Sequence, residues 1–259
     1  MNAIDTLFLY DPKFYLVAIP AVLLRGVSKA GFGSGLGGFS LPLLITVLPP
    51  TQAAAILLPI LCLIDIAGFG AYYKKWDSQS LRVILPGALL GTAAGWLVFD
   101  TLSDGLIIFL VGIIALVFST KGLLKSSTSA AALPGSRARG TFWSALSGFT
   151  SFLSHSGGPP IQVYLIPLKL EKEKFIATIN IFFMLTNMFK IVPYALLGQF
   201  SKINMIASAL MLPLVPIGVW CGLWLQRRID AKSFYAIVQI CLLLTGLLMM
   251  YEGGRKLWA

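Results

Sequence analysis

Two stretches rich in glycine and serine hold the groups that we expect to carry the chemistry of this chain. The first reads Gly-Phe-Gly-Ser-Gly-Leu-Gly-Gly over 31–38, and the second, over 148–160, contains Ser-His-Ser-Gly-Gly-Pro-Pro. Each follows an apolar run and precedes a shorter one, a pattern typical of a helix broken inside a membrane. A break leaves backbone N–H groups free, and helix N-termini attract anions. The sequence therefore predicts an anion site where the two breaks meet.

The candidate site residues form a binding group and a smaller coupling group. Glycine lets the chain turn and lets a ligand approach closely, while serine, histidine, asparagine and lysine supply hydrogen-bond donors. The binding group is Gly33, Ser34, Gly35, Gly37, Gly38, Ser151, Ser154, His155, Ser156, Gly157, Gly158, Asn187 and Lys190. The candidates for coupling or gating are Arg25, Lys29 and Asp65.

Several of these residues also have a purely structural interpretation. Arg25 and Lys29 could be functional, because charges inside a membrane segment are expensive, or they could snorkel to the headgroups. Asp65 and Lys190 could form a mutual salt bridge or take part in ion coupling. His155, the only histidine, could shuttle protons, act as a fixed hydrogen-bond donor, or be a bystander.

Glycines have the same ambiguity, because small residues also let membrane helices pack closely. For the glycines of the two breaks we favour the binding interpretation, since short helices and serines accompany them. For four glycines in the middle of regular apolar segments we favour packing alone: Gly91, Gly95, Gly218 and Gly222.

Composition sets the solvent in which these residues work. Hydrophobic residues make up 57% of the 259 positions and charged residues 12%, with a mean hydropathy of +0.85, whereas soluble domains have about a quarter charged residues. Alternation of the porin type is absent, so we expect an all-α polytopic membrane protein. The net charge of +10 lies mostly in short loops, which argues against nucleic-acid binding.

Sequence motifs exclude other function classes. No Walker, Rossmann, HExxH or GxSxG pattern occurs, so we expect neither ATP-driven transport nor an enzyme, and no cofactor. Cys62, Cys221 and Cys241 lie in apolar segments without the spacing of metal ligands, so no metal is predicted.

Apolar segments divide the chain into two similar halves. Residues 1–125 and 141–259 each contain one interrupted region and three long apolar segments, and 126–140 forms a linker. We therefore predict a repeat in which each half is a broken or re-entrant hairpin plus three transmembrane helices. Pro86, Gly91 and Gly95 match Pro213, Gly218 and Gly222 at a constant offset of 127.

Basic residues predict the orientation of the halves. Four connections hold 13 of the 20 basic residues: 74–82, 121–139, 169–174 and 227–232. If each hairpin returns to its starting side, these connections share one face, which the positive-inside rule makes cytoplasmic. A connection that is basic in one half then corresponds to a non-basic connection in the other half. We therefore predict that the repeat is inverted and that both termini are periplasmic. Arg255 and Lys256 oppose this assignment, because they fall at an outside C-terminus.

The glycine motifs also resemble those of a known family. The segment 31–38, its partner Gly-Phe-x-Ser followed by Gly-Gly-Pro-Pro at 157–160, and the pair Asn187 and Lys190 resemble the TauE/SafE family, also called the 4-toluene sulfonate uptake permease family, over essentially the whole chain. The resemblance implies export of small sulfur-containing anions, such as sulfite or organosulfonates, across a bacterial inner membrane. It places the paired motifs on Gly31–Gly38 and Ser151–Pro160.

The sequence as a whole thus predicts a secondary transporter that works by alternating access around a midplane site. The expected partners are a small anionic substrate and the lipid bilayer, with a coupling proton or other ion left open, as are the substrate itself and the oligomeric state. An anion channel, a transporter of other small organic anions such as carboxylates, and a membrane-embedded assembly or redox factor remain as alternatives.

Overall fold

The computed structural model describes residues 8–34, 40–99, 104–124 and 135–258, and the described part consists of helices and their connections. Five helices come from the first half: α1 (Pro12–Phe32), α2 (Ser40–Leu44), α3 (Pro50–Ala71), α4 (Ser78–Leu97) and α5 (Asp104–Leu124). The second half supplies α6 (Arg137–Ser154), α7 (Gly158–Leu165), the short 3-10 helix Ile166–Leu168, α8 (Lys172–Leu196), α9 (Lys202–Met211), α10 (Leu214–Arg228) and α11 (Ala231–Trp258).

Helix length and composition confirm an all-α polytopic membrane protein. Five helices are long and apolar enough to cross a membrane: α1, α3, α4, α8 and the segment Ser233–Leu257 of α11. One of the three long apolar segments expected in the second half, residues 203–226, is not a straight helix, because the structure bends it by 45° between α9 and α10. Pro213 lies at this break, where its ring and missing N–H interrupt a helix.

Both interrupted regions contain the expected helix breaks. The first helix ends at Phe32, and Gly33 and Ser34 follow with φ of 59° and 76°. The sixth helix ends at Ser154, and His155 follows with φ of 51°. A left-handed residue stops a helix by turning the chain away from its axis. The eight residues of α7 are too few to cross a hydrocarbon core.

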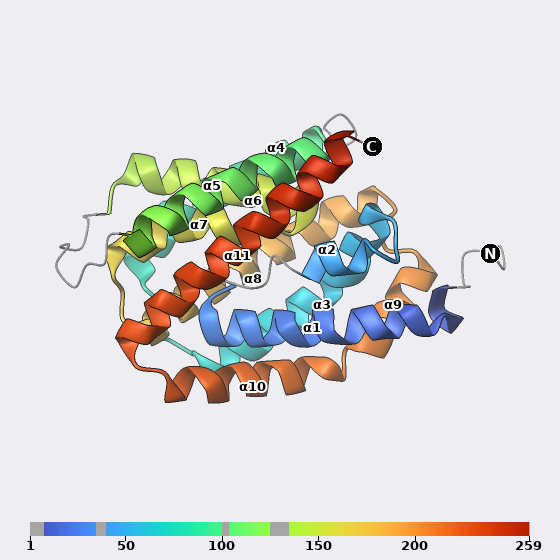
Figure 1. The fold of residues 1–259 in the computed structure, drawn as a ribbon, viewed down its shortest axis with the longest axis horizontal. Coiled ribbons are helices and arrows are strands. Elements are labelled where there is room, and N and C mark those ends of the chain that lie inside the picture. Colours follow the sequence, from blue (N-terminus) through green and yellow to red (C-terminus); the bar gives the residue numbers. More distant parts are fainter. Residues whose placement is uncertain (1–7, 35–39, 100–103, 125–134, 259) are drawn as a thin grey trace.

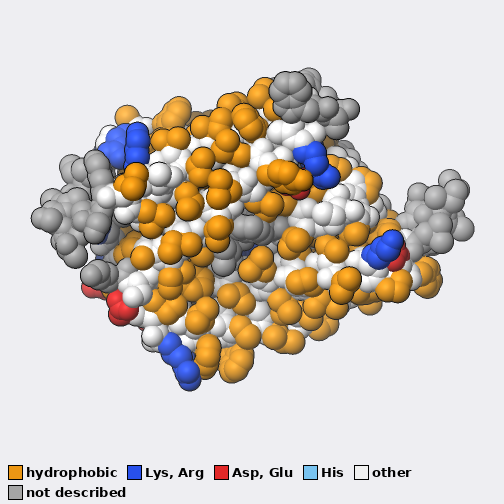
Figure 2. All heavy atoms as spheres, in the orientation of Figure 1, with side chains coloured by type: hydrophobic (Ala, Val, Ile, Leu, Met, Phe, Trp, Pro, Cys, Tyr) orange, Lys and Arg blue, Asp and Glu red, His pale blue; other side chains and the backbone are white. Residues whose placement is uncertain are grey.

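The bundle has two distinct ends (Figure 1). Both chain termini lie at one end, which we call the terminus end. At the opposite end, the linker end, α3 connects to α4, α5 stops, α6 starts, and α10 connects to α11. Apolar side chains cover most of the face between the ends, with charged side chains near the ends themselves (Figure 2). This distribution is the one expected for a surface in contact with lipid.

Glycines let three pairs of helices approach closely. A Cβ on Gly91 of α4 would lie 1.8 Å from the carbonyl oxygen of Ala145 in α6, and one on Gly222 of α10 would lie 2.7 Å from that of Val27 in α1. A Cβ on Gly246 of α11 would lie 2.8 Å from a backbone nitrogen of α5. The packing interpretation of the mid-helix glycines is therefore confirmed.

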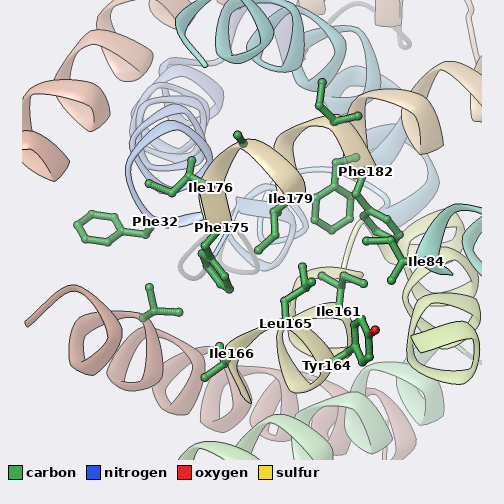
Figure 3. Close-up of a cluster of buried hydrophobic side chains, with 14 of the residues drawn as sticks. Phe32, Ile84, Ile161, Tyr164, Leu165, Ile166, Phe175, Ile176, Ile179 and Phe182 are labelled. Carbon is green, nitrogen blue, oxygen red and sulfur yellow. The ribbon is translucent and has the colours of Figure 1, made fainter. Parts of the chain in front are cut away.

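An apolar cluster fixes the second hairpin from the linker side (Figure 3). Ile161 and Leu165 of α7 are fully buried against Phe175 and Phe182 of α8, with Phe32 at the end of α1 in the same cluster. Burying aromatic and branched side chains contributes roughly 1.5–3 kcal/mol each. The short helix is thus positioned by packing rather than by its own hydrogen bonds.

The glycine contacts predict a sharp difference between two substitutions. Gly91→Ala should destabilise the fold by about 2 kcal/mol or more, because its methyl group would overlap the backbone of α6. Gly70→Ala is the matched control, since a Cβ there meets nothing within 4 Å, and alanine stabilises a helix interior by roughly 0.5–1 kcal/mol. Melting temperatures in detergent should fall for the first variant and stay constant or rise for the second. Equal melting temperatures would contradict the close α4–α6 contact.

Candidate functional site

The tips of the two hairpins touch. A Cβ built on Gly158 would lie 3.0 Å from the carbonyl oxygen of Ser34, and Gln162 of α7 donates from Nε2 to the carbonyl oxygen of Gly33 at 3.2 Å. The sequence predicts such a meeting of the two breaks. Gly35, Gly37 and Gly38 lie outside the described residues.

Lys190 of α8 lies fully buried beside the second hairpin. Its Nζ donates to the carbonyl oxygen of Ser151 at 2.7 Å and to the Ser151 Oγ at 2.8 Å. The third neighbour of Nζ is Nδ1 of His155, at 3.2 Å. All three are neutral acceptors, so they satisfy the hydrogen bonds of the ammonium without neutralising its charge.

His155 has both ring nitrogens engaged. A lysine ammonium can only donate, so Nδ1 accepts from Lys190 and the ring proton lies on Nε2. Nε2–H then donates to the carbonyl oxygen of Ala54 in α3 at 2.9 Å. Of the three sequence-based roles for His155, this geometry fits the fixed hydrogen-bond donor, which ties the hairpin to α3 and orients the imidazole toward Lys190.

Arg25 and Lys29 of α1 are only 5% and 3% exposed, so of the two alternatives for them the structure does not support snorkelling to the headgroups. Arg25 donates from Nη2 to the carbonyl oxygen of His155 at 3.1 Å. Lys29 forms a buried ion pair with Asp65 of α3. Asn187 of α8 donates to the other carboxylate oxygen of Asp65 at 2.7 Å.

These contacts replace the mutual salt bridge that the sequence suggests for Asp65 and Lys190. Asp65 of α3 contacts α1 and α8, whereas Lys190 of α8 contacts the second hairpin. The carboxylate is therefore held by Lys29 and Asn187, and the ammonium by Ser151 and His155.

The two helix breaks have a polar residue at the same spacing, but with different chemistry. Lys29 precedes the left-handed cap Gly33 by four residues, and Ser151 precedes the left-handed cap His155 by four residues. Lys29 binds Asp65 in α3, and Ser151 binds Lys190 in α8, so each binds a long helix of its own half. The first half thus forms an ion pair where the second half leaves an ammonium bound to a hydroxyl group.

The buried charges of this cluster do not cancel. Arg25, Lys29 and Lys190 contribute three positive charges in their ordinary forms, and Asp65 contributes one negative charge, with none of the four more than 5% exposed. The sum is +2. Buried charge without a counter-charge is expensive in a medium of low dielectric constant. A bound anion would lower that cost, so anion binding is the chemistry that the arrangement can do.

The remaining serines of the second hairpin bond to its own backbone. Ser154 and Ser156 donate to the carbonyl oxygens of Thr150 and Ser154. A Cβ on Gly157 would lie 2.6 Å from the carbonyl oxygen of Ser147. These residues shape the hairpin around Lys190, and the contacts of Gly157 are close packing.

Sequence reasoning missed two residues that hold the hairpin. Ser147 donates from Oγ to the carbonyl oxygen of Gly157 at 2.6 Å. Its place four residues before Ser151, on the same helix face, is a signal that could have found it. Gln162 lies within an apolar run, and only the contact of the two tips explains it.

Buried acceptors accompany the donors. Among the described residues, the side-chain oxygens of Asn180, Asn187 and Gln162 are buried without a hydrogen-bond partner. Asn187 must direct its NH₂ group at Asp65, so its oxygen is the atom left over. The described part of the chain holds no group of three His, Cys, Asp or Glu residues that could bind a metal.

Comparison with known proteins adds one match. A family model described as "Sulfite exporter TauE/SafE" matches residues 18–249, which includes every contact of the cluster. Comparisons with curated proteins and with solved structures give no match.

The ion pair predicts strong coupling between two substitutions. Lys29→Met or Asp65→Leu alone should cost roughly 3–5 kcal/mol, because each leaves a buried charge without its partner. The double variant should recover much of that loss, as residues in direct contact do. Melting temperatures of the four proteins complete the cycle. Losses that simply add would contradict the pairing of Lys29 with Asp65.

Proposed function

Because the chain belongs to the sulfite exporter TauE/SafE family, we propose that it is a secondary transporter that exports a small sulfur-containing anion, such as sulfite or an organosulfonate. The chain is a multi-pass membrane protein, with apolar helices long enough to span a bilayer. The family is one of transporters, which argues against a catalytic function. The substrate, the site and the mechanism are the parts that we propose.

The observation that carries the proposal is the buried ammonium of Lys190 among neutral acceptors. The oxygens of a sulfite or sulfonate group accept hydrogen bonds and supply the missing negative charge. Arg25 lies on the other side of His155 and offers a second cationic donor group. The substrate in this proposal binds beside Lys190, where the hairpins meet.

The helix pairings support an inverted repeat. In the proposed repeat, α1 of the first half corresponds to α6 of the second half, and α4 corresponds to α10. The contact between α1 and α10 therefore corresponds to the contact between α6 and α4. Glycines line both contacts. Figure 1 also places together, at the linker end, the α3–α4 and α10–α11 connections, the last turn of α5 and the first turn of α6, all of which carry basic residues. We propose that this end is cytoplasmic in a bacterial inner membrane and that both termini are periplasmic.

Alternating access follows from one hairpin in each half. In the described conformation, the apolar cluster of Figure 3 fills the linker side of the second hairpin. Cavities reach toward the hairpin from the terminus end. We propose that movement of one repeat against the other reverses this asymmetry and passes the anion across.

Lys190→Gln tests the proposed site. The change removes the charge and should lower sulfite efflux from proteoliposomes by roughly 10- to 150-fold, the equivalent of a charge-assisted hydrogen bond of about 1.5–3 kcal/mol. Lys75→Gln is the matched control, because Lys75 forms an exposed pair with Glu173, far from the hairpins. Efflux by Lys190→Gln equal to that of the control would refute the site. Saturable flux with counterflow distinguishes the carrier from a channel.

The proposed orientation predicts the location of both chain ends. Reporter enzymes that are active only in the periplasm should be active when fused to either terminus, and inactive when inserted in the linker 126–140. A reporter that is inactive at either terminus, with the fusion present in the membrane, would refute the assignment.

A further inference from the structure

Two adjoining cavities lie at the terminus end of the bundle. The outer one has a volume of about 500 Å³ and the inner one about 160 Å³. Thr51 and Gln199 line both, so the two cavities share a wall. The inner cavity also reaches Ala54, Ser154, Tyr194 and Lys256. Its volume is several times the roughly 30 Å³ of one water molecule, which leaves room for a small oxyanion and some of its water.

The inner cavity is lined by residues that adjoin the Lys190 site. Ala54 lines the cavity and accepts the hydrogen bond from His155 Nε2. Ser154 is the residue before His155. Tyr194 lies one helical turn after Lys190, and its ring centroid is 6.0 Å from that of His155. These three residues thus separate the cavity from the buried ammonium.

Lys256, on the last turn of α11, gives the inner cavity its charge. Among the described residues, it is the only charged one that lines this cavity, and no described carboxylate lines either cavity. The neighbouring Arg255 is paired with Glu252 at 3.1 Å, whereas Lys256 takes part in none of the ion pairs found among the described residues. The two basic residues that oppose the positive-inside pattern therefore have different surroundings.

We propose that the inner cavity is a second anion-binding site, in which Lys256 holds the transported oxyanion on its way between the Lys190 site and the periplasm. The proposal rests on the function proposed above. Thr51 and Gln199 supply neutral hydrogen-bonding groups in the same cavity, and the Lys256 ammonium makes the potential along the described part of the lining more positive. A single cation on this path accounts for a lysine at an end of the bundle where the orientation rule disfavours one.

An exchange assay tests this second site. External sulfite at increasing concentration drives the release of labelled internal sulfite from proteoliposomes in which the terminus end faces outward. Lys256→Gln should raise the apparent KM for external sulfite about fivefold, the equivalent of one lysine at a membrane surface. Lys256→Glu should raise it further, and Lys256→Arg should restore it. Arg255→Gln is the matched control and should behave as the wild type, because Arg255 lies outside the cavity lining.

The outcomes of this assay distinguish failure of the second site from failure of the proposed function. In one outcome, the wild-type protein shows saturable exchange while Lys256→Gln and Lys256→Glu have the same KM as the Arg255→Gln control. That result would overturn the second site but not the proposed transport function. A wild-type protein that exchanges no anion would overturn the proposed function itself. Melting temperatures of the variants separate a change in affinity from a loss of fold.

Discussion

The burial of the Lys190 ammonium among neutral acceptors is the constraint on which the rest of the site depends. An ammonium in hydrocarbon needs three acceptors, and the second hairpin provides them through Ser151 and the ring of His155. The ring can face Lys190 because His155 takes a left-handed conformation that ends α6, and because Ala54 and Arg25 hold its other polar groups. The same residues thus form the helix break and surround the Lys190 ammonium. Because none of these neighbours carries a negative charge, we expect an anion to bind there.

The duplication that we propose accounts for both the likeness and the difference of the two hairpins. Each ends a long helix with a left-handed cap, and each has a polar side chain four residues earlier that reaches the long helix of its own half. In the first half this contact is the closed ion pair of Lys29 and Asp65. In the second half a serine takes the place of the charged partner. In the proposed repeat, the shared helix break is the scaffold, and the difference between the halves leaves the charge of Lys190 without an ion-pair partner among the described residues.

The sequence predicted the membrane class, the two interrupted regions and the packing glycines, because lipid imposes strong rules on composition and helix length. It also selected Arg25, Lys29, Asp65, Asn187 and Lys190, since charges and amides stand out in an apolar chain. It did not predict their partners correctly. Pairing depends on which face each helix turns toward its neighbours, and the sequence does not fix that face. The contact of Gln162 with Gly33 depends in the same way on the tertiary structure.

The location of the anion can be measured directly. Selenite resembles sulfite and scatters anomalously, so diffraction from crystals grown with it would locate the bound ion. An anomalous peak within about 3 Å of Lys190 Nζ, the length of a charge-assisted hydrogen bond, is the result expected if the substrate neutralises the buried ammonium. Anion density elsewhere, with Lys190 still bound only to Ser151 and His155, would contradict it.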